Sequence, residues 1–234
     1  PGTDIILKKA EIRGVESRGM LLSEREMGIS DEHDGIVDLP IDTPIGAPVI
    51  EVMGLDDPIV EIAITPNRGD CLGVRGIARD LAAAGIGTLK SLDTKPIPGR
   101  FESPIDVTLD FPNDKKDACP YFVGRFVRGV RNGPSPAWVQ DKLVSVGLRP
   151  ISALVDITNL VTVELGRPLH VFDAAKVKGN VCARMAREGE ELLALDGKTY
   201  AMDAEMCVIA DEAKAEALGG IMGGEESGCT ETTT

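Results

Sequence analysis

The chain has 234 residues, of which 43% are hydrophobic and 27% are charged, and its mean hydropathy is +0.01. No stretch approaches the ~20 apolar residues of a membrane span, so no membrane-spanning protein is expected. The net charge of −13 argues against a stand-alone nucleic-acid binder, because neutralising phosphates requires a basic face. The five cysteines lack Cys-x-x-Cys spacing, so we expect reduced thiols in the cytoplasm rather than a zinc site or disulfides. The chain starts at Pro1, and we expect it to be a piece of a longer protein.

The first hundred residues predict short elements separated by turns. Residues 5–22 alternate loosely and predict two short strands, and residues 23–28 predict one capped helical turn. Residues 59–64 are rich in Ile and Val and predict a strand, which a turn joins to a helix over residues 72–84. Residues 91–104 contain three prolines and a glycine and predict a linker.

The rest of the chain alternates strands and helices. Strands are predicted over residues 105–109 and 121–130, and helices over residues 135–146 and 152–165. Four more short strands follow, with an Asp-Gly hairpin signal between the second and third: 181–185, 191–195, 198–202 and 206–210. This order predicts an α+β or mixed α/β fold.

His170 is one of two histidines and lies just beyond the last predicted helix. Thr158 and Asn159 lie about three turns back on that helix, and Asp173 follows the histidine. A histidine near hydroxyl and amide groups can orient an ester or an attacking water. A hydrogen-bonded structural histidine is the simpler interpretation of the residue type alone.

Four glycines fall within the six residues of the sequence GGIMGG, at positions 219–224. They let the backbone approach another group closely and present its N–H groups, although a tight structural turn is an equal alternative. The segment is neither a P-loop nor a dinucleotide fingerprint, because the spacing is wrong and the acidic pair Glu225-Glu226 follows. No metal site is expected, since Cys229 is the only nitrogen or sulfur ligand near this pair, Asp211 and Glu212.

Basic residues are concentrated in one part of the acidic chain. They are Lys115, Lys116, Arg125, Arg128 and Arg131. This local surface is a candidate for contacting RNA, and a solvated face of mixed charge is the alternative.

Three groups of motifs, taken together, resemble the β subunit of bacterial phenylalanyl-tRNA synthetase. The first is ITPNRGDCL followed by RGIARD, over residues 64–80. The second is GLRPI, VDITN and ELGRPLHVFD, over residues 147–173. The third is LDGK and GGIMGG, over residues 195–224. Each motif is specific, and their order and spacing match that family over nearly the whole chain.

The resemblance implies four regions. Residues 1–45 resemble the end of the family's inserted tRNA-binding OB domain, and residues 46–90 resemble the second half of a small α/β domain. Residues 91–104 are then a linker, and residues 105–234 an editing domain of the B3/B4 type that is truncated at its C-terminus.

The resemblance also implies an activity, the hydrolysis of tyrosyl-tRNA(Phe) formed in error. A pocket built for phenylalanine cannot strongly reject tyrosine, which only adds a hydroxyl, so a second site restores accuracy. Six site residues follow by similarity: the catalytic group Thr158, Asn159 and His170, and the pocket-lining group Pro168, Gly220 and Gly223. The glycines leave room for the substrate, while the histidine and the amide position the ribose or the water.

The implied partners are a synthetase α subunit in an α2β2 heterotetramer, tRNA(Phe), and tyrosine as the editing ligand. ATP and Mg²⁺ serve the α subunit, and no cofactor is expected in this chain. In the family, the strand after the glycine-rich loop carries a glutamate suited to the tyrosine hydroxyl, and this chain stops before that strand, at Thr234. The alternatives are a non-catalytic tRNA-binding or scaffold module of the same synthetase and an unrelated ligand-binding protein, which would not share the motifs.

Overall fold

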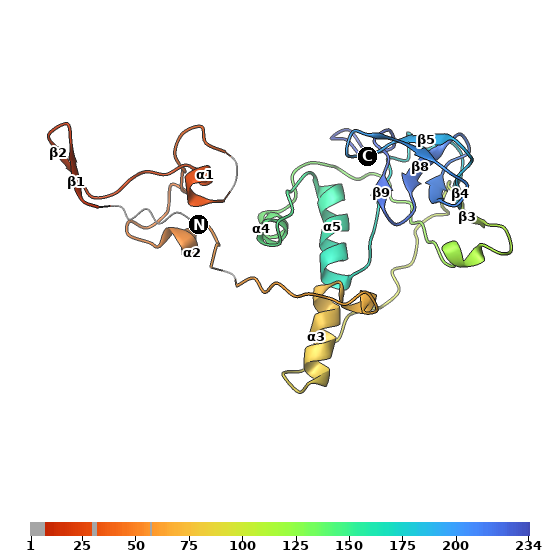
Figure 1. Ribbon diagram of the computed structural model, residues 1–234, viewed down its shortest axis with the longest axis horizontal. Helices are drawn as coiled ribbons and strands as arrows, with labels where there is room; N and C mark the ends of the chain where they lie inside the picture. The colour runs from red at the N-terminus through yellow and green to blue at the C-terminus, as the bar shows by residue number, and fades with distance from the viewer. Residues whose placement is uncertain (1–7, 30–31, 57) are drawn as a thin grey trace. The chain divides into compact units, whose positions relative to one another are not determined.

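The computed structural model describes residues 8–29, 32–56 and 58–234 (Figure 1). By its internal contacts the chain divides into two compact units, Pro1–Pro58 and Ile59–Thr234. The chain combines helices with both parallel and antiparallel strand pairs, so the mixed α/β class is confirmed. The finer domain boundaries at residues 45, 90 and 104 stay predictions.

The first unit contains a short β-hairpin. Strand β1 (Ala10–Ile12) pairs antiparallel with β2 (Val15–Ser17). Arg13 and Gly14 both have positive φ, 53° and 78°, as a two-residue turn of the primed type requires. The predicted strand pair is thus confirmed for the described residues, whereas residues 5–7 lie outside them.

Two short helices complete this unit. Helix α1 (Glu24–Met27) begins at Ser23, whose side chain and that of Glu26 form a reciprocal capping box. It ends at Gly28, whose φ of 71° is left-handed, so the predicted capped turn is confirmed. Helix α2 (Val49–Val52) was not predicted.

The second unit holds the three longer helices and two single 3-10 turns. The helices are α3 (Val74–Ala83), α4 (Ala137–Ser145) and α5 (Ala153–Leu165), and the turns are η1 (Gly69–Cys71) and η2 (Lys116–Ala118). A glycine with positive φ follows each helix. Helix α5 packs against both α4 and α3. Of the described helices, none has the length and apolar content that crossing a membrane requires.

A five-stranded sheet forms the other half of this unit, in the order β3-β4-β7-β8-β9. Strands β3 and β4 are parallel, and the remaining pairs are antiparallel. Beside the sheet, β5 and β6 form a separate hairpin. The strands are β3 (Val107–Asp110), β4 (Val181–Met185), β5 (Glu190–Leu193), β6 (Thr199–Met202), β7 (Cys207–Ala210), β8 (Ala215–Leu218) and β9 (Met222–Gly223). Two small apolar clusters pack around β4, β7 and β8.

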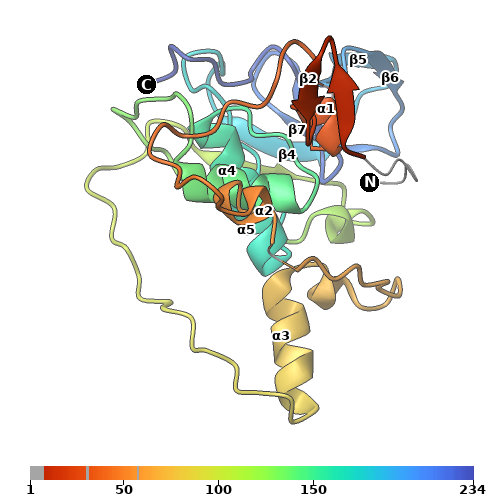
Figure 2. The same cartoon turned by 90° about the vertical axis from the view of Figure 1, so that its left-hand side faces the viewer.

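Two predicted strands are wrong. Residues 59–64 and 121–130 form no strand, because no neighbouring backbone pairs with either of them within the described part of the chain. Along 121–130, Phe122 and Phe126 are half-buried, whereas Tyr121 is 72% exposed. The segment between α3 and β3 carries neither helix nor strand and runs as a long strap (Figure 2).

Candidate functional site

His170 lies in the loop after α5, and its imidazole ring sits against Gly223 of β9. A Cβ atom built on Gly223 would fall 2.1 Å from Cε1 and 2.6 Å from Nε2 of that ring. Only glycine leaves room for the imidazole at this distance. Two residues from different predicted motifs are therefore side by side.

Hydrogen bonds fix the His170 loop to the segment that follows β9. The backbone N–H of Asp173 donates to the carbonyl of Ser227 at 2.8 Å, and Thr233 Oγ1 donates to Asp173 Oδ2 at 2.7 Å. Lys176 Nζ donates to the carbonyl of Gly228 at 2.6 Å. Asp173 is buried, so water competes little for these bonds.

The glycine-rich segment is also held from its other side. The N–H of Gly224 donates to the carbonyl of Glu216 on β8 at 2.8 Å. The N–H of Glu225 donates to the carbonyl of Leu193 on β5 at 2.9 Å, and that of Leu195 to the carbonyl of Gly223 at 3.0 Å. The backbone beneath the imidazole is thus clamped between the sheet and the β5–β6 hairpin.

The environment of His170 favours its neutral form. The ring of Phe172 meets the imidazole edge-on, with centroids 4.5 Å apart and planes at 72°. Burial of part of the ring lowers the pKa of His170, because the imidazolium loses hydration there. The residue as a whole stays exposed, so solvent has access to it. A neutral imidazole keeps one nitrogen free to accept a proton or a hydrogen bond.

The other four predicted site residues lie on α5, in the loop that follows it and in the glycine-rich segment. Thr158 on α5 donates its hydroxyl to the carbonyl of Val155 at 2.6 Å. Asn159 is half-buried on the same helix, and Pro168 is exposed in the following loop. Gly220 has a φ of 73° and open space beside it. Among the described residues none of the four forms a hydrogen bond with the imidazole or its glycine, and their roles stay predictions.

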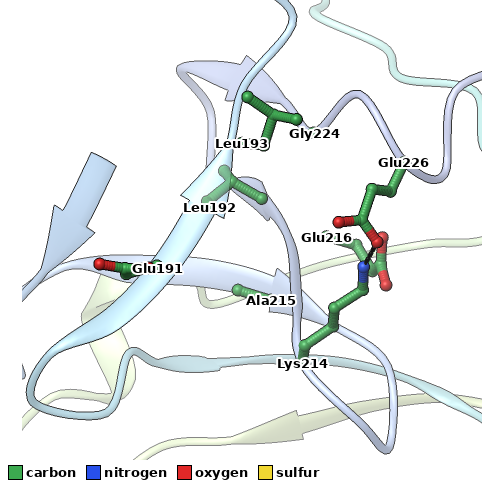
Figure 3. Close-up of a pocket in the computed structure, with 8 residues that line it drawn as sticks. All are labelled: Glu191, Leu192, Leu193, Lys214, Ala215, Glu216, Gly224 and Glu226. Atoms are coloured by element: carbon green, nitrogen blue, oxygen red, sulfur yellow. Dashed lines mark hydrogen bonds and ion pairs between the residues drawn. The ribbon is translucent and has the colours of Figure 1, made fainter. Parts of the chain in front are cut away.

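A small pocket of about 30 Å³ lies on the far side of the glycine-rich segment (Figure 3). It is lined by Glu191, Leu192, Leu193, Lys214, Ala215, Glu216, Gly224 and Glu226. Successive residues of an extended chain face opposite ways, so Gly223 meets the imidazole while Gly224 meets Glu216 and Leu192. His170 lines neither this pocket nor a second one, in the first unit, that Ser23 and Asp38 help to line.

Comparison with known proteins places this site in a family. Residues 118–234, half of the chain, match the B3/4 domain model. The chain belongs to the B3/4 domain family. All six predicted site residues and the pocket lie within the matched B3/4 domain.

The whole chain is also similar to phenylalanine–tRNA ligase β subunits, so the resemblance seen in the sequence is confirmed. Identity is 58% over 234 residues to that of Paramagnetospirillum magneticum and 60% to that of Cereibacter sphaeroides. Each comparison covers 100% of this chain but 29% of the relative, so the chain spans less than a third of their length. A solved N-terminal fragment of the Pyrococcus horikoshii β subunit matches 72% of this chain and 50% of its own, at 18% identity and a TM-score of 0.37, which supports no structural argument.

Sequence reasoning did not predict the burial of three acidic residues of the B3/4 domain. Asp156 is 1% exposed and accepts hydrogen bonds from the Ser135 hydroxyl and, at 2.8 Å, from the N–H of Ile151. Asp173 anchors the His170 loop, and Glu216 lies under the glycine-rich segment. For Asp156 and Asp173 the available signal was a charged residue within an apolar run, because such a residue is rarely buried without a partner.

Among the described residues two groups could hold an ion by spacing, the exposed Glu32, His33 and Asp34, and the cluster Asp70, Cys71 and Asp80. In the second group, two arginines already neutralise the carboxylates: Arg68 and Arg79. Both lie outside the B3/4 domain, and the absence of a metal from the site stays a prediction.

Several of the basic residues have internal partners. Arg125 Nη2 donates to the carbonyl of Ile97 at 3.0 Å, and the Arg128 guanidinium lies 4.0 Å from the ring centroid of Phe101. Both contacts hold the strap that follows α3 against residues 121–130. The structure therefore gives these two arginines a local role that the RNA hypothesis did not anticipate.

Proposed function

We propose that the B3/4 domain of this chain hydrolyses the ester of tyrosyl-tRNA(Phe), as a proofreading step of phenylalanine–tRNA ligase. The observation that carries the proposal is the exposed imidazole of His170 packed on Gly223. A solvent-accessible, neutral imidazole can orient a water or accept its proton. The similarity of the whole chain to ligase β subunits supplies the substrate class.

The hydrolysis needs little more than positioning. In this proposal His170 holds the attacking water or the terminal ribose, and Asn159 on α5 supplies an amide to the same group. Gly220, which has open space beside it, leaves room for the aminoacyl group. Ordering of the reactants alone accounts for large accelerations of intramolecular reactions, so no covalent intermediate is required.

The proposal places the chain in a larger enzyme. The α subunit of an α2β2 assembly carries aminoacylation with ATP and Mg²⁺, and tRNA(Phe) moves its charged end to this domain. Tyrosine is the ligand that the editing site reads, and the assembly works in the cytoplasm. These statements rest on the resemblance to ligase β subunits rather than on a contact within this chain.

The test is deacylation of preformed tyrosyl-tRNA(Phe), with phenylalanyl-tRNA(Phe) as the control substrate. The proposal expects selective loss of the tyrosyl ester with the complete two-subunit enzyme, and a loss of that activity in His170→Ala. His33→Ala is the matched control, because it removes the other histidine, which lies in the first unit. An unchanged rate in His170→Ala removes this residue from the mechanism.

A non-catalytic tRNA-binding or scaffold module is the second candidate. One observation favours it, namely that His170 lines neither of the two pockets described above. The same experiment separates the two candidates. A complete enzyme that binds tRNA(Phe) yet never clears the tyrosyl ester supports the scaffold and overturns editing.

A further inference from the structure

Glu216 is a buried carboxyl that the proposed hydrolysis does not use. It lies on β8 and is 3% exposed, and its Oε1 atom has no hydrogen-bond partner. The hydroxyl of Ser227, which is 1% exposed, is the other buried side-chain polar atom without a partner among the described residues. The two groups are neighbours, since the Ser227 hydroxyl lowers the pKa of the Glu216 carboxyl, against the larger rise that burial causes.

Among the described residues Glu216 forms no ion pair, although the charge of the Lys214 ammonium lowers its pKa. The ammonium of Lys214 is paired with Glu226 across the mouth of the pocket (Figure 3). Arg184 is engaged by Glu190 through two hydrogen bonds of 2.8 and 2.7 Å. An uncompensated buried carboxylate is costly, so the surroundings favour a neutral group at this position.

A neighbouring carboxylate also favours the neutral form of Glu216. Asp211 accepts the backbone N–H groups of Lys178, Ala213 and Lys214, which keeps it ionised and raises the pKa of Glu216. Burial makes the largest contribution to that rise. Glu191, a further carboxyl of the pocket, is exposed.

The backbone of Glu216 supports the segment that carries Gly223. Its carbonyl accepts the N–H of Gly224 at 2.8 Å, and a Cβ atom on Gly224 would fall 2.7 Å from that carbonyl oxygen. Glu216 also lines the small pocket together with Gly224, on the face of the segment opposite to the imidazole. A change at Glu216 therefore reaches His170 only by moving the backbone of the glycine-rich segment, which lies between the two residues.

We propose that Glu216 is a positioning residue that holds the glycine-rich segment in place while its carboxyl is protonated. The neutral acid places no charge beneath the segment and can donate a hydrogen bond to the Asp211 carboxylate, an interaction that raises the pKa of Glu216. Ionisation removes that donor and leaves a charge beneath the segment. The effect of Glu216 on the stability of the fold is independent of the proposed function, whereas its effect on hydrolysis rests on that function.

The pH dependence has a defined sign. The pKa of Glu216 is higher in the folded chain than in the unfolded one, so its stabilising contribution is complete below the unfolded pKa. The contribution is lost as pH rises through the folded pKa. Between the two values, each pH unit lowers the ratio of folded to unfolded chain by about tenfold.

The experiment measures unfolding by urea across this pH range for the wild-type chain and Glu216→Gln. The amide copies the neutral acid, so the variant should keep its stability as pH rises and the wild type should lose it. Glu191→Gln, an exposed carboxyl of the same pocket, should follow the wild type. Parallel curves for wild type and Glu216→Gln overturn the proposal.

Two further readouts keep the test independent of folding defects and of the proposed hydrolysis. In the wild type labelled with ¹³C-glutamate, the Glu216 carboxyl should titrate above the other glutamates, and an ordinary titration overturns the proposal even if Glu216→Gln fails to fold. In the complete enzyme, deacylation should decline at alkaline pH in the wild type but not in Glu216→Gln. If the complete enzyme never deacylates tyrosyl-tRNA(Phe), only the proposed hydrolysis is refuted. The pH dependence of urea unfolding still decides whether Glu216 is a positioning residue.

Discussion

Replacing Gly223 by alanine should displace the imidazole of His170 and abolish most of the deacylation. The new Cβ would lie 2.1 Å from Cε1, whereas carbon atoms in ordinary contact are about 3.6 Å apart. The ring must therefore move by about 1.5 Å, and a misplacement of about 1 Å can cost a reaction about 10²-fold. We expect single-turnover deacylation of tyrosyl-tRNA(Phe) to fall by about 100-fold.

The cost in stability should be much smaller. His170 is exposed and can swing outward, so the chain loses little beyond its edge-on contact with Phe172, about 0.5–1.5 kcal/mol. Urea unfolding measures this cost. Gly133→Ala is the matched control, because a Cβ there meets nothing within 4 Å and its φ is not positive.

An NMR titration of the two histidines tests the geometry without any activity. Once displaced into water, the His170 ring regains hydration, so its pKa should rise from its depressed value toward that of an ordinary histidine. His33→Gln assigns the remaining resonances. If Gly223→Ala leaves both the pKa of His170 and the deacylation rate unchanged, the ring does not rest on this glycine and the reasoning fails.

Two further predictions concern the frame of the second unit. Arg184 holds the pKa of Glu190 at about 2, so this pair stabilises the fold above the unfolded pKa near 4.5 and its contribution is lost as pH falls toward 2. Acid unfolding should show a loss of at most about 3 kcal/mol that is missing in Glu190→Gln, because desolvation offsets part of the pairing. Gly73→Ala puts a Cβ 2.2 Å from the backbone nitrogen of Gly166 and should cost about 1–3 kcal/mol in urea unfolding by forcing α3 away from α5. Gly69→Ala, which meets open space, should cost less; equal losses would contradict the packing argument.

Elements with local signals were predictable from the sequence. The serine cap of α1, the glycines beyond α3 and α4, and the Asp-Gly turn between β5 and β6 each act within a few residues. The strand predicted over residues 121–130 fails because a strand also needs a partner, which no local pattern reports. Strand β8 was missed for the opposite reason, since Ala-Glu-Ala-Leu has little β preference and pairs only because β7 and β9 flank it.

The same limit applies to the candidate site. Residue type and family resemblance indicated His170 and Gly223 separately, and their contact appears only when the loop after α5 meets β9. Glu216 gave no usable signal, because an acidic residue in a short segment usually lies in solvent. Its burial depends on the pairing of β8 with β7 on one side and β9 on the other.

The parallel pairing of β3 with β4 constrains the order in which this chain folds. Asp106 and Asn180, which are joined by a hydrogen bond at the edge of this pair, are 74 residues apart in sequence. Both α4 and α5 lie between them and contact each other locally. On a ribosome, β3 must therefore wait unpaired while two helices and their loops emerge, and closing so long a loop slows folding. A chaperone that shields exposed strand edges would act on β3 during this interval.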